Sequence, residues 1–220
     1  LMFGQAAVSA PDPMMEQLDK FQDEWERIFF TLPESEHARR FKALLKQAHA
    51  LREQYPERAE PLVFEGIVLC TYAGSDGGLG ALSKVKKARK LLQSSLDIDP
   101  KALGASAYVT LGNLYHRLPG WPISFGDNDI ARGYFESALK LFPDAIDTNY
   151  FYGEFLLSQG EFDAAVPFLE KAAKAPIRPD SARSDEKLRG EITLALADAR
   201  AKRSDRTGFF SGLIPKVGGK

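Results

Sequence analysis

The stretch "LGNLYHRLPGWPISFGDNDIARGYFESALKLFP", residues 111–143, decides the fold. Its two ends have helical spacing, and its middle, "LPGWPISFGDND" at 118–129, reads as a loop because it holds two prolines and two glycines. Small residues at Gly112, Ala131 and Ala138 allow two helices to approach closely. Pro143 ends the second helix, since proline cannot continue the backbone hydrogen bonds. The stretch therefore predicts a pair of antiparallel helices.

The same spacing of small residues, large residues and prolines recurs along the chain. The copies comprise Gly66 with Ala88, Leu92, Ser95 and Pro100; Gly153 with Ala165, Leu169, Ala172 and Pro176; and a weaker copy at Leu44, Ala48, Leu51 and Pro56. The order Leu-Gly-x-x-Tyr in one helix, followed by Ala-x3-Phe-x2-Ala in the next, resembles the tetratricopeptide repeat. The resemblance covers residues 60–176 well and residues 14–58 loosely.

This resemblance implies an all-α fold, a right-handed superhelix of antiparallel helix pairs with about nine helices. We expect a flexible N-terminus at 1–12, a repeat domain at 13–203 and an apolar, glycine-containing tail at 204–220. Within the domain we expect pairs at 13–56, 59–100, 103–143 and 146–176 and a capping helix at 184–202. The capping helix is expected to bury one face, made of Leu188, Ile192, Leu194, Ala195, Leu196 and Ala199. An unrelated helical bundle is the alternative.

The repeats are longer than the ordinary unit. Pro56, Pro100 and Pro143 lie 44 and 43 residues apart, whereas a tetratricopeptide repeat has about 34 residues. The excess falls between the paired helices, in "AGSDGGLGALS" at 73–83 and in the stretch at 118–129. We expect two inserted loops on the same edge of the superhelix, about 10 Å apart, the spacing of packed helices.

The residue inventory favours no catalytic chemistry. The chain has 44% hydrophobic and 27% charged residues and a net charge of −1, an ordinary globular balance. Its single cysteine, Cys70, lies in an apolar helical stretch, and its three histidines form no metal-binding motif. The lysines of "KVKKARK" at 84–90 lie opposite an apolar face, which indicates a solvated surface. We therefore expect no enzyme activity, cofactor, metal or nucleic-acid partner.

The concave surface is one candidate binding site, because the first helix of each pair lines it in tetratricopeptide proteins. The candidate groove residues are Val63, Ile67, Val109, Asn113, His116, Tyr150 and Glu154. Family members that hold chaperone C-termini use a clamp of Lys, Arg and Asn at such positions. Only Asn113 matches that clamp, so the resemblance disfavours this mode of binding.

The inserted loop at 118–129 is the second candidate, with Trp121, Phe125 and Asp127 as candidate loop-edge residues. Asp127 is placed to cap the following helix. The two aromatic side chains either pack on their own helices or are offered to a partner. The apolar tail around Phe209 and Phe210 is expected to dock on the body, with partner binding and disorder as alternatives.

Together these features predict a non-enzymatic interaction scaffold with a protein or peptide partner. Val8-Ser9-Ala10 has the small-residue form of a signal-peptide cleavage site. The chain is thus expected to be exported to the periplasm, with the cytoplasm as the alternative, and no transmembrane segment is expected. It resembles small periplasmic tetratricopeptide proteins of Gram-negative bacteria. A similarity to the T-component of tripartite periplasmic transporters implies an alternative function as a transport accessory that binds a small ligand.

Overall fold

The computed structural model describes residues 12–78 and 80–216. All of the regular secondary structure in this part of the chain is helical. Nine α-helices occur in this part. They are α1 (Pro13–Thr31), α2 (Glu34–Gln54), α3 (Ala59–Asp76), α4 (Ala81–Ile98), α5 (Ser106–Arg117), α6 (Asn128–Leu141), α7 (Ile146–Ser158), α8 (Phe162–Lys174) and α9 (Ala182–Arg200). There are also two short 3-10 helices in this part, η1 (Pro179–Ser181) and η2 (Phe209–Leu213). The prediction of an all-α fold of antiparallel helix pairs is confirmed.

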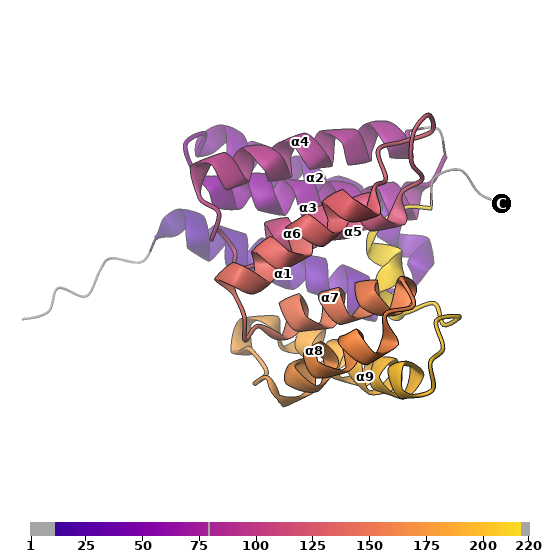
Figure 1. Cartoon of the computed structure of the whole chain (residues 1–220). Coiled ribbons are helices and arrows are strands. Elements are labelled where there is room, and N and C mark those ends of the chain that lie inside the picture. Colours follow the sequence, from indigo (N-terminus) through magenta and orange to yellow (C-terminus); the bar gives the residue numbers. More distant parts are fainter. Residues whose placement is uncertain (1–11, 79, 217–220) are drawn as a thin grey trace, which may run out of the picture.

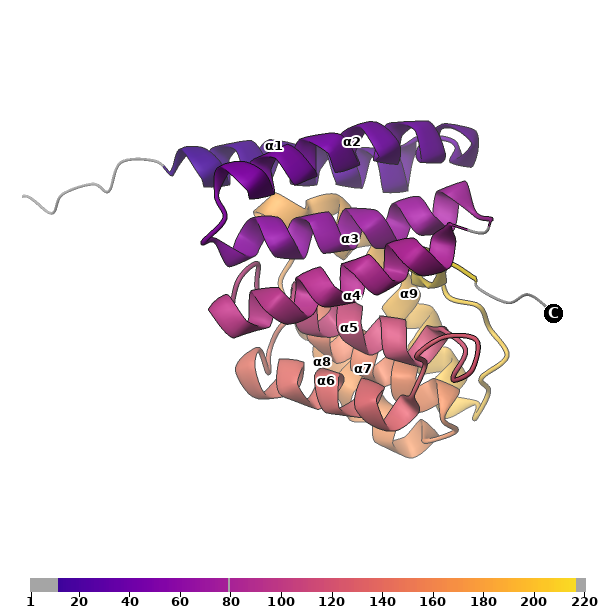
Figure 2. The ribbon, with the colours of Figure 1, turned by 90° about the horizontal axis from the view of Figure 1, so that it is seen from above.

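The helices stack in chain order (Figures 1 and 2). Each helix contacts the next, and the most extensive contacts join α3 to α4, α2 to α3 and α7 to α8. Figure 2 shows α1 and α2 at one end of the stack and α6 to α8 toward the other. None of the helices in the described ranges is long and apolar enough to cross a membrane.

Three glycines fix how the paired helices approach. A Cβ atom added to any of them would lie only 2.6–2.8 Å from a buried side chain of the partner helix, closer than carbon atoms come in real structures. The three pairs are Gly66 with Leu92, Gly112 with Phe135, and Gly153 with Leu169. The register predicted from the small and large residues is therefore confirmed in all three pairs.

Prolines mark the ends of the second helices. The helices α2, α4, α6 and α8 each end two residues before a proline, at Pro56, Pro100, Pro143 and Pro176 respectively. Proline removes a backbone donor, and it also disfavours helical dihedral angles at the residue before it. Each of these helices therefore ends just before the residue whose helical conformation the proline disfavours.

The prediction of an inserted loop at 73–83 is wrong. Most of the segment 73–83 is helical, because α3 continues to Asp76 and α4 begins at Ala81. The extra residues lengthen both helices to 18 residues, compared with 13 each for α7 and α8. An ion pair of 2.8 Å from Lys84 to Asp76 spans the short turn. Only the second insertion is an extended loop, so the predicted edge of two adjacent loops does not form.

The last helix differs from the prediction at one position. Leu188, Ile192, Ala195 and Ala199 are buried, as expected from their spacing. Leu194 is 49% exposed, because it lies on the opposite side of α9 from this stripe. The helix still packs on both α7 and α8.

The two ends of the stack meet. Helix α1 contacts both α9 and η1, and Arg183 of α9 pairs with Asp23 of α1, 160 residues away in sequence. The first and last helices thus close the concave side of the stack rather than leaving an open groove.

Candidate functional site

The concave side is filled by the C-terminal segment. Phe210 is 3% exposed, and its ring centroid lies 5.8 Å from that of Tyr150 and 5.6 Å from that of Phe151. Its neighbour Phe209 packs on Phe29 and Phe30 of α1, with ring centroids 5.4 and 5.9 Å apart. The expected docking of this segment on the body is confirmed.

A buried ion cluster fixes the segment just before η2. Arg206 contacts Glu154 of α7 at 2.8 Å, and Glu191 and Asp198 of α9 at 2.8 and 2.7 Å. Burial disfavours the charge of Arg206, but the Asp198 hydrogen bond and the nearby carboxylates outweigh it and raise the pKa of the guanidinium. Burial also raises the pKa of Glu154, against the opposing charge of Arg206. Glu154, predicted to face a partner, therefore holds the chain's own tail.

The other groove candidates are core residues or line recesses in the surface. Val63 and Tyr150 are 0% and 1% exposed, so no partner reaches them in this conformation. Ile67, Val109 and Asn113 line a cavity that is described below. The Asn113 amide donates to the carbonyl of Val109 at 2.9 Å, so the one clamp-like residue is used within its own helix.

His116 also has a packing role. Its ring contacts the Phe155 ring edge-on at 5.1 Å, and its Nδ1 lies 2.9 Å from Oδ1 of Asn128. Burial lowers the pKa of His116, so its neutral form is favoured. This arrangement joins the end of α5 to the start of α6 and to α7.

The loop between α5 and α6 is closed at its base. The Gly126 N–H donates to the carbonyl of Pro119 at 2.9 Å, and the Asp127 N–H donates to that of Tyr115 at 2.8 Å. A side chain at Gly126 would overlap the carbonyl group of Leu118. The Asp127 carboxylate accepts the N–H groups of the first turn of α6, as predicted for a helix cap.

The two aromatic residues of this loop behave differently. Phe125 packs inward, with its ring 5.2 Å from that of Tyr115 and the guanidinium of Arg89 4.2 Å from its centre. Trp121 is 90% exposed, so of the two alternatives inward packing holds for Phe125 and not for Trp121.

Three of the exposed large apolar side chains belong to this loop and the start of α6. Five large hydrophobic residues of the described chain are exposed: Trp121, Ile123, Ile130, Ile98 and Leu194. The first three lie within ten residues of each other in sequence, on the loop and the first turn of α6. Because a large exposed apolar group is costly in water, such a cluster is typical of an interaction surface.

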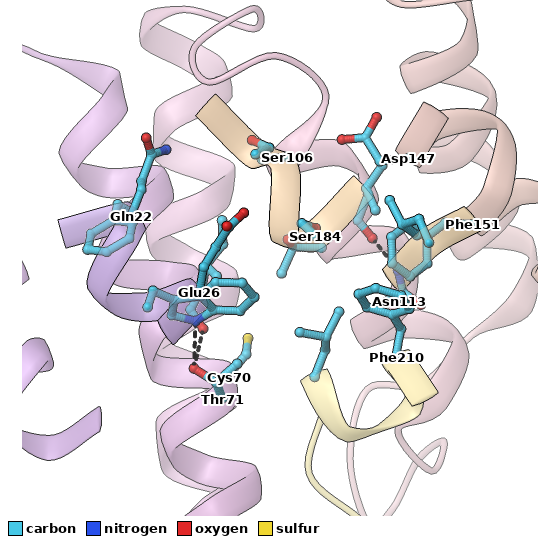
Figure 3. A pocket seen from close by; sticks show the side chains of 18 of the residues that line it. Gln22, Glu26, Cys70, Thr71, Ser106, Asn113, Asp147, Phe151, Ser184 and Phe210 are labelled. Carbon is cyan, nitrogen blue, oxygen red and sulfur yellow. Dashed lines mark hydrogen bonds between the residues drawn. The ribbon is translucent and has the colours of Figure 1, made fainter. Parts of the chain in front are cut away.

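A cavity of about 170 Å³ lies on the concave side, between α1, α3, α5, α7, η1, α9 and the C-terminal segment (Figure 3). Its walls include Trp25 and Glu26 of α1 and Phe210 of η2. The Trp25 indole N–H donates to the hydroxyl of Thr71 on α3 at 3.2 Å, which fixes the ring in the wall. Sequence reasoning missed Trp25 and Glu26, because nothing in the repeat pattern indicates that α1 lies against α9.

No catalytic arrangement appears among these residues. Burial raises the pKa of the Cys70 thiol to about 12, so it is not a thiolate nucleophile at neutral pH. Within residues 12–78 and 80–216, no three His, Cys, Asp or Glu side chains come together in a metal-binding arrangement.

Comparison with known proteins agrees with this architecture. Residues 123–176, which span α6 to α8, match the family model of the tetratricopeptide repeat. No curated protein matches the chain. The match and the stacked helix pairs support a tetratricopeptide-type repeat in this part of the chain, within an all-α fold. Repeats of this type generally mediate protein–protein interaction and are not catalytic.

Proposed function

We propose that the protein is a non-enzymatic scaffold that binds a protein partner through the loop between α5 and α6, with Trp121 as the anchor. The observation that carries this proposal is the 90% exposure of Trp121 on a loop closed at its base by two backbone hydrogen bonds. Tryptophan is enriched at the energetic centres of protein interfaces. A closed loop presents the ring with little ordering cost on binding.

The concave side is a weaker candidate for the partner surface. Its centre is occupied by Phe210, and its edge by the Arg206 ion cluster. A peptide would have to displace Phe210 before it could contact Tyr150. The loop offers its apolar groups without such a displacement.

The test uses a photo-crosslinking amino acid placed at position 121 and, as a matched control, at Leu194, an exposed apolar residue on α9. We expect a discrete cross-linked partner from position 121 and not from position 194. Trp121→Ala should then weaken binding of that partner at least tenfold with unchanged stability, because the ring contacts little of the protein itself. Equal cross-linking from both positions, or full affinity in Trp121→Ala, would contradict the proposal.

Binding of a small ligand is a second candidate function, and the cavity bordered by Trp25 and Glu26 favours it. In a stack with an open concave groove, no α1–α9 contact or C-terminal segment would border such a recess. The role in transport that the similarity to T-components implied stays a prediction.

Export to the periplasm is the localisation we propose, supported by the small-residue pattern Val8-Ser9-Ala10. These residues lie outside the described part of the chain. Mass spectrometry of the mature N-terminus from separated cell fractions tests this proposal. Cleavage after Ala10 in the periplasmic fraction is expected, and an uncleaved cytoplasmic chain would contradict it.

A further inference from the structure

The cavity on the concave side has an aromatic interior. Trp25, Phe64, Phe151 and Phe210 all contribute to its walls, together with aliphatic residues such as Ile67 (Figure 3). Its volume is about 170 Å³, and an engineered apolar cavity of about 150 Å³ is known to hold benzene. The space therefore admits one aromatic ring or an aliphatic group of similar size.

One buried carboxylate borders this space without a close counter-ion. Glu26 is 8% exposed, and Figure 3 shows its carboxylate near Ser184, pointing into the cavity. The nearest cation, Arg183, lies 4.0 Å away and pairs more closely with Asp23. The backbone N–H of Ser184 is the remaining polar group that favours the charged form. Burial outweighs these partners and raises the pKa of Glu26.

The surroundings of Glu26 are acidic. A surface recess between α1 and η1–α9 shares Glu26 with the cavity and carries Asp19, Asp23, Asp180, Glu186 and Arg183. Within the cavity, the one arginine, Arg178, is already held by Asp185 at 2.7 Å and Asp147 at 3.1 Å. The field at the cavity mouth therefore attracts cations and repels anions.

We propose that this cavity binds a small primary amine with an apolar body, such as an arylalkylamine. The ammonium group contacts the Glu26 carboxylate at the mouth, and the body lies among Trp25, Phe151 and Phe210. A cation beside aromatic faces and a desolvated carboxylate gains from both interactions. The proposal rests on the second candidate function, ligand binding in the cavity, and uses no residue of the loop at 118–127.

The test is a fluorescence titration with three ligands of one shape and different charge: benzylamine, benzyl alcohol and benzoate. The chain has two tryptophans, so Trp121→Phe leaves Trp25 in the cavity wall as the single reporter. We expect benzylamine to bind at least tenfold more tightly than benzyl alcohol, and benzoate to bind least. A tenfold ratio corresponds to about 1.4 kcal/mol, within the range for a hydrogen bond to a charged group.

Two charge-neutralising variants on α1 test whether the preference for benzylamine depends on the Glu26 carboxylate. Glu26→Gln should reduce the preference for benzylamine over benzyl alcohol to less than threefold. Glu24→Gln makes the same change at a residue that does not line the cavity, where the carboxylate pairs with Arg27 at 2.8 Å. This control should keep the preference. Circular dichroism and unfolding midpoints of both variants establish that they are folded.

A cavity-filling variant, Ile67→Phe, separates binding inside from binding at the surface. It should weaken benzylamine and benzyl alcohol alike, because both bodies use the same space. If both ligands bind but Glu26→Gln keeps the preference, the cavity binds ligands and the assignment of the cation is overturned. If neither ligand binds the parent protein, or if Ile67→Phe changes nothing, ligand binding in the cavity is itself overturned.

Discussion

Gly112→Ala tests the contact that sets the geometry of the central repeat. The added Cβ would lie 2.8 Å from Cε1 and Cζ of the Phe135 ring, which is 1% exposed and has no room to move away. Alanine gains about 1 kcal/mol over glycine in a helix, whereas overpacking a core costs about 1–3 kcal/mol. We expect the variant to range from neutral to about 2 kcal/mol less stable.

The matched control is Gly133→Ala in α6, where an added Cβ meets nothing within 4 Å. Both variants share the gain in helix propensity, so the difference between their free energies of unfolding isolates the clash, about 1–3 kcal/mol. Urea unfolding followed by circular dichroism measures both. Replacing Phe135 by Leu should relieve the clash, and the double-mutant cycle should give a coupling of at least 0.5 kcal/mol. If Gly112→Ala is stabilised as much as Gly133→Ala, the close approach of α5 and α6 is refuted.

Three further predictions concern the C-terminal segment, the Cys70 thiol and the buried carboxylate of Glu65 on α3. Phe210→Ala should lower the free energy of unfolding by up to about 3–5 kcal/mol, because it empties a buried site. It should also speed proteolysis of the C-terminal segment, and unchanged proteolysis would contradict docking. Cys70, whose pKa burial raises to about 12, should react with a disulfide reagent only as the protein unfolds, and stoichiometric labelling of the folded protein would contradict its burial. Burial disfavours ionisation of Glu65, but its contacts with Arg52 and Lys87 outweigh burial and lower its pKa. The stabilisation is therefore fully present above the ordinary pKa of 4.5 and is lost as pH falls from there through the lowered pKa of the folded protein. Glu65→Gln should be about 1.5–3 kcal/mol less stable at pH 7, with a smaller loss on acidification in urea unfolding.

The sequence was sufficient to predict the helix pairs because each pair depends on local information. Gly112 and Phe135 lie 23 residues apart, and the same small-to-large relation repeats in two other pairs. The prolines after the second helices act on their own neighbours, which is why the helix ends follow them closely. The glycine-rich composition of 73–83 led to the wrong prediction of a loop, because glycine permits a loop but does not require one.

The candidate site was harder to predict because it is assembled from distant parts of the chain. Trp25 and Phe210 border one cavity although 185 residues separate them. Helical periodicity predicts which face of α1 is apolar, but not that its Glu26 meets α9. In the same way, the composition of the loop could not distinguish Trp121 from Phe125, since only the course of its backbone decides which ring reaches Tyr115.

The contact between α1 and α9 limits how this protein can vary in length. In an open stack, each repeat depends only on its neighbours, so repeats can be added or lost during evolution and the ends can fray independently. Here one more helix pair would move α9 about 10 Å or more from α1 and break the Arg183–Asp23 contact. This contact therefore disfavours insertion of a further helix pair between α1 and α9. Loss of α1 or α9 removes the contacts that each makes with the other, so we expect these two helices to unfold together rather than one after the other.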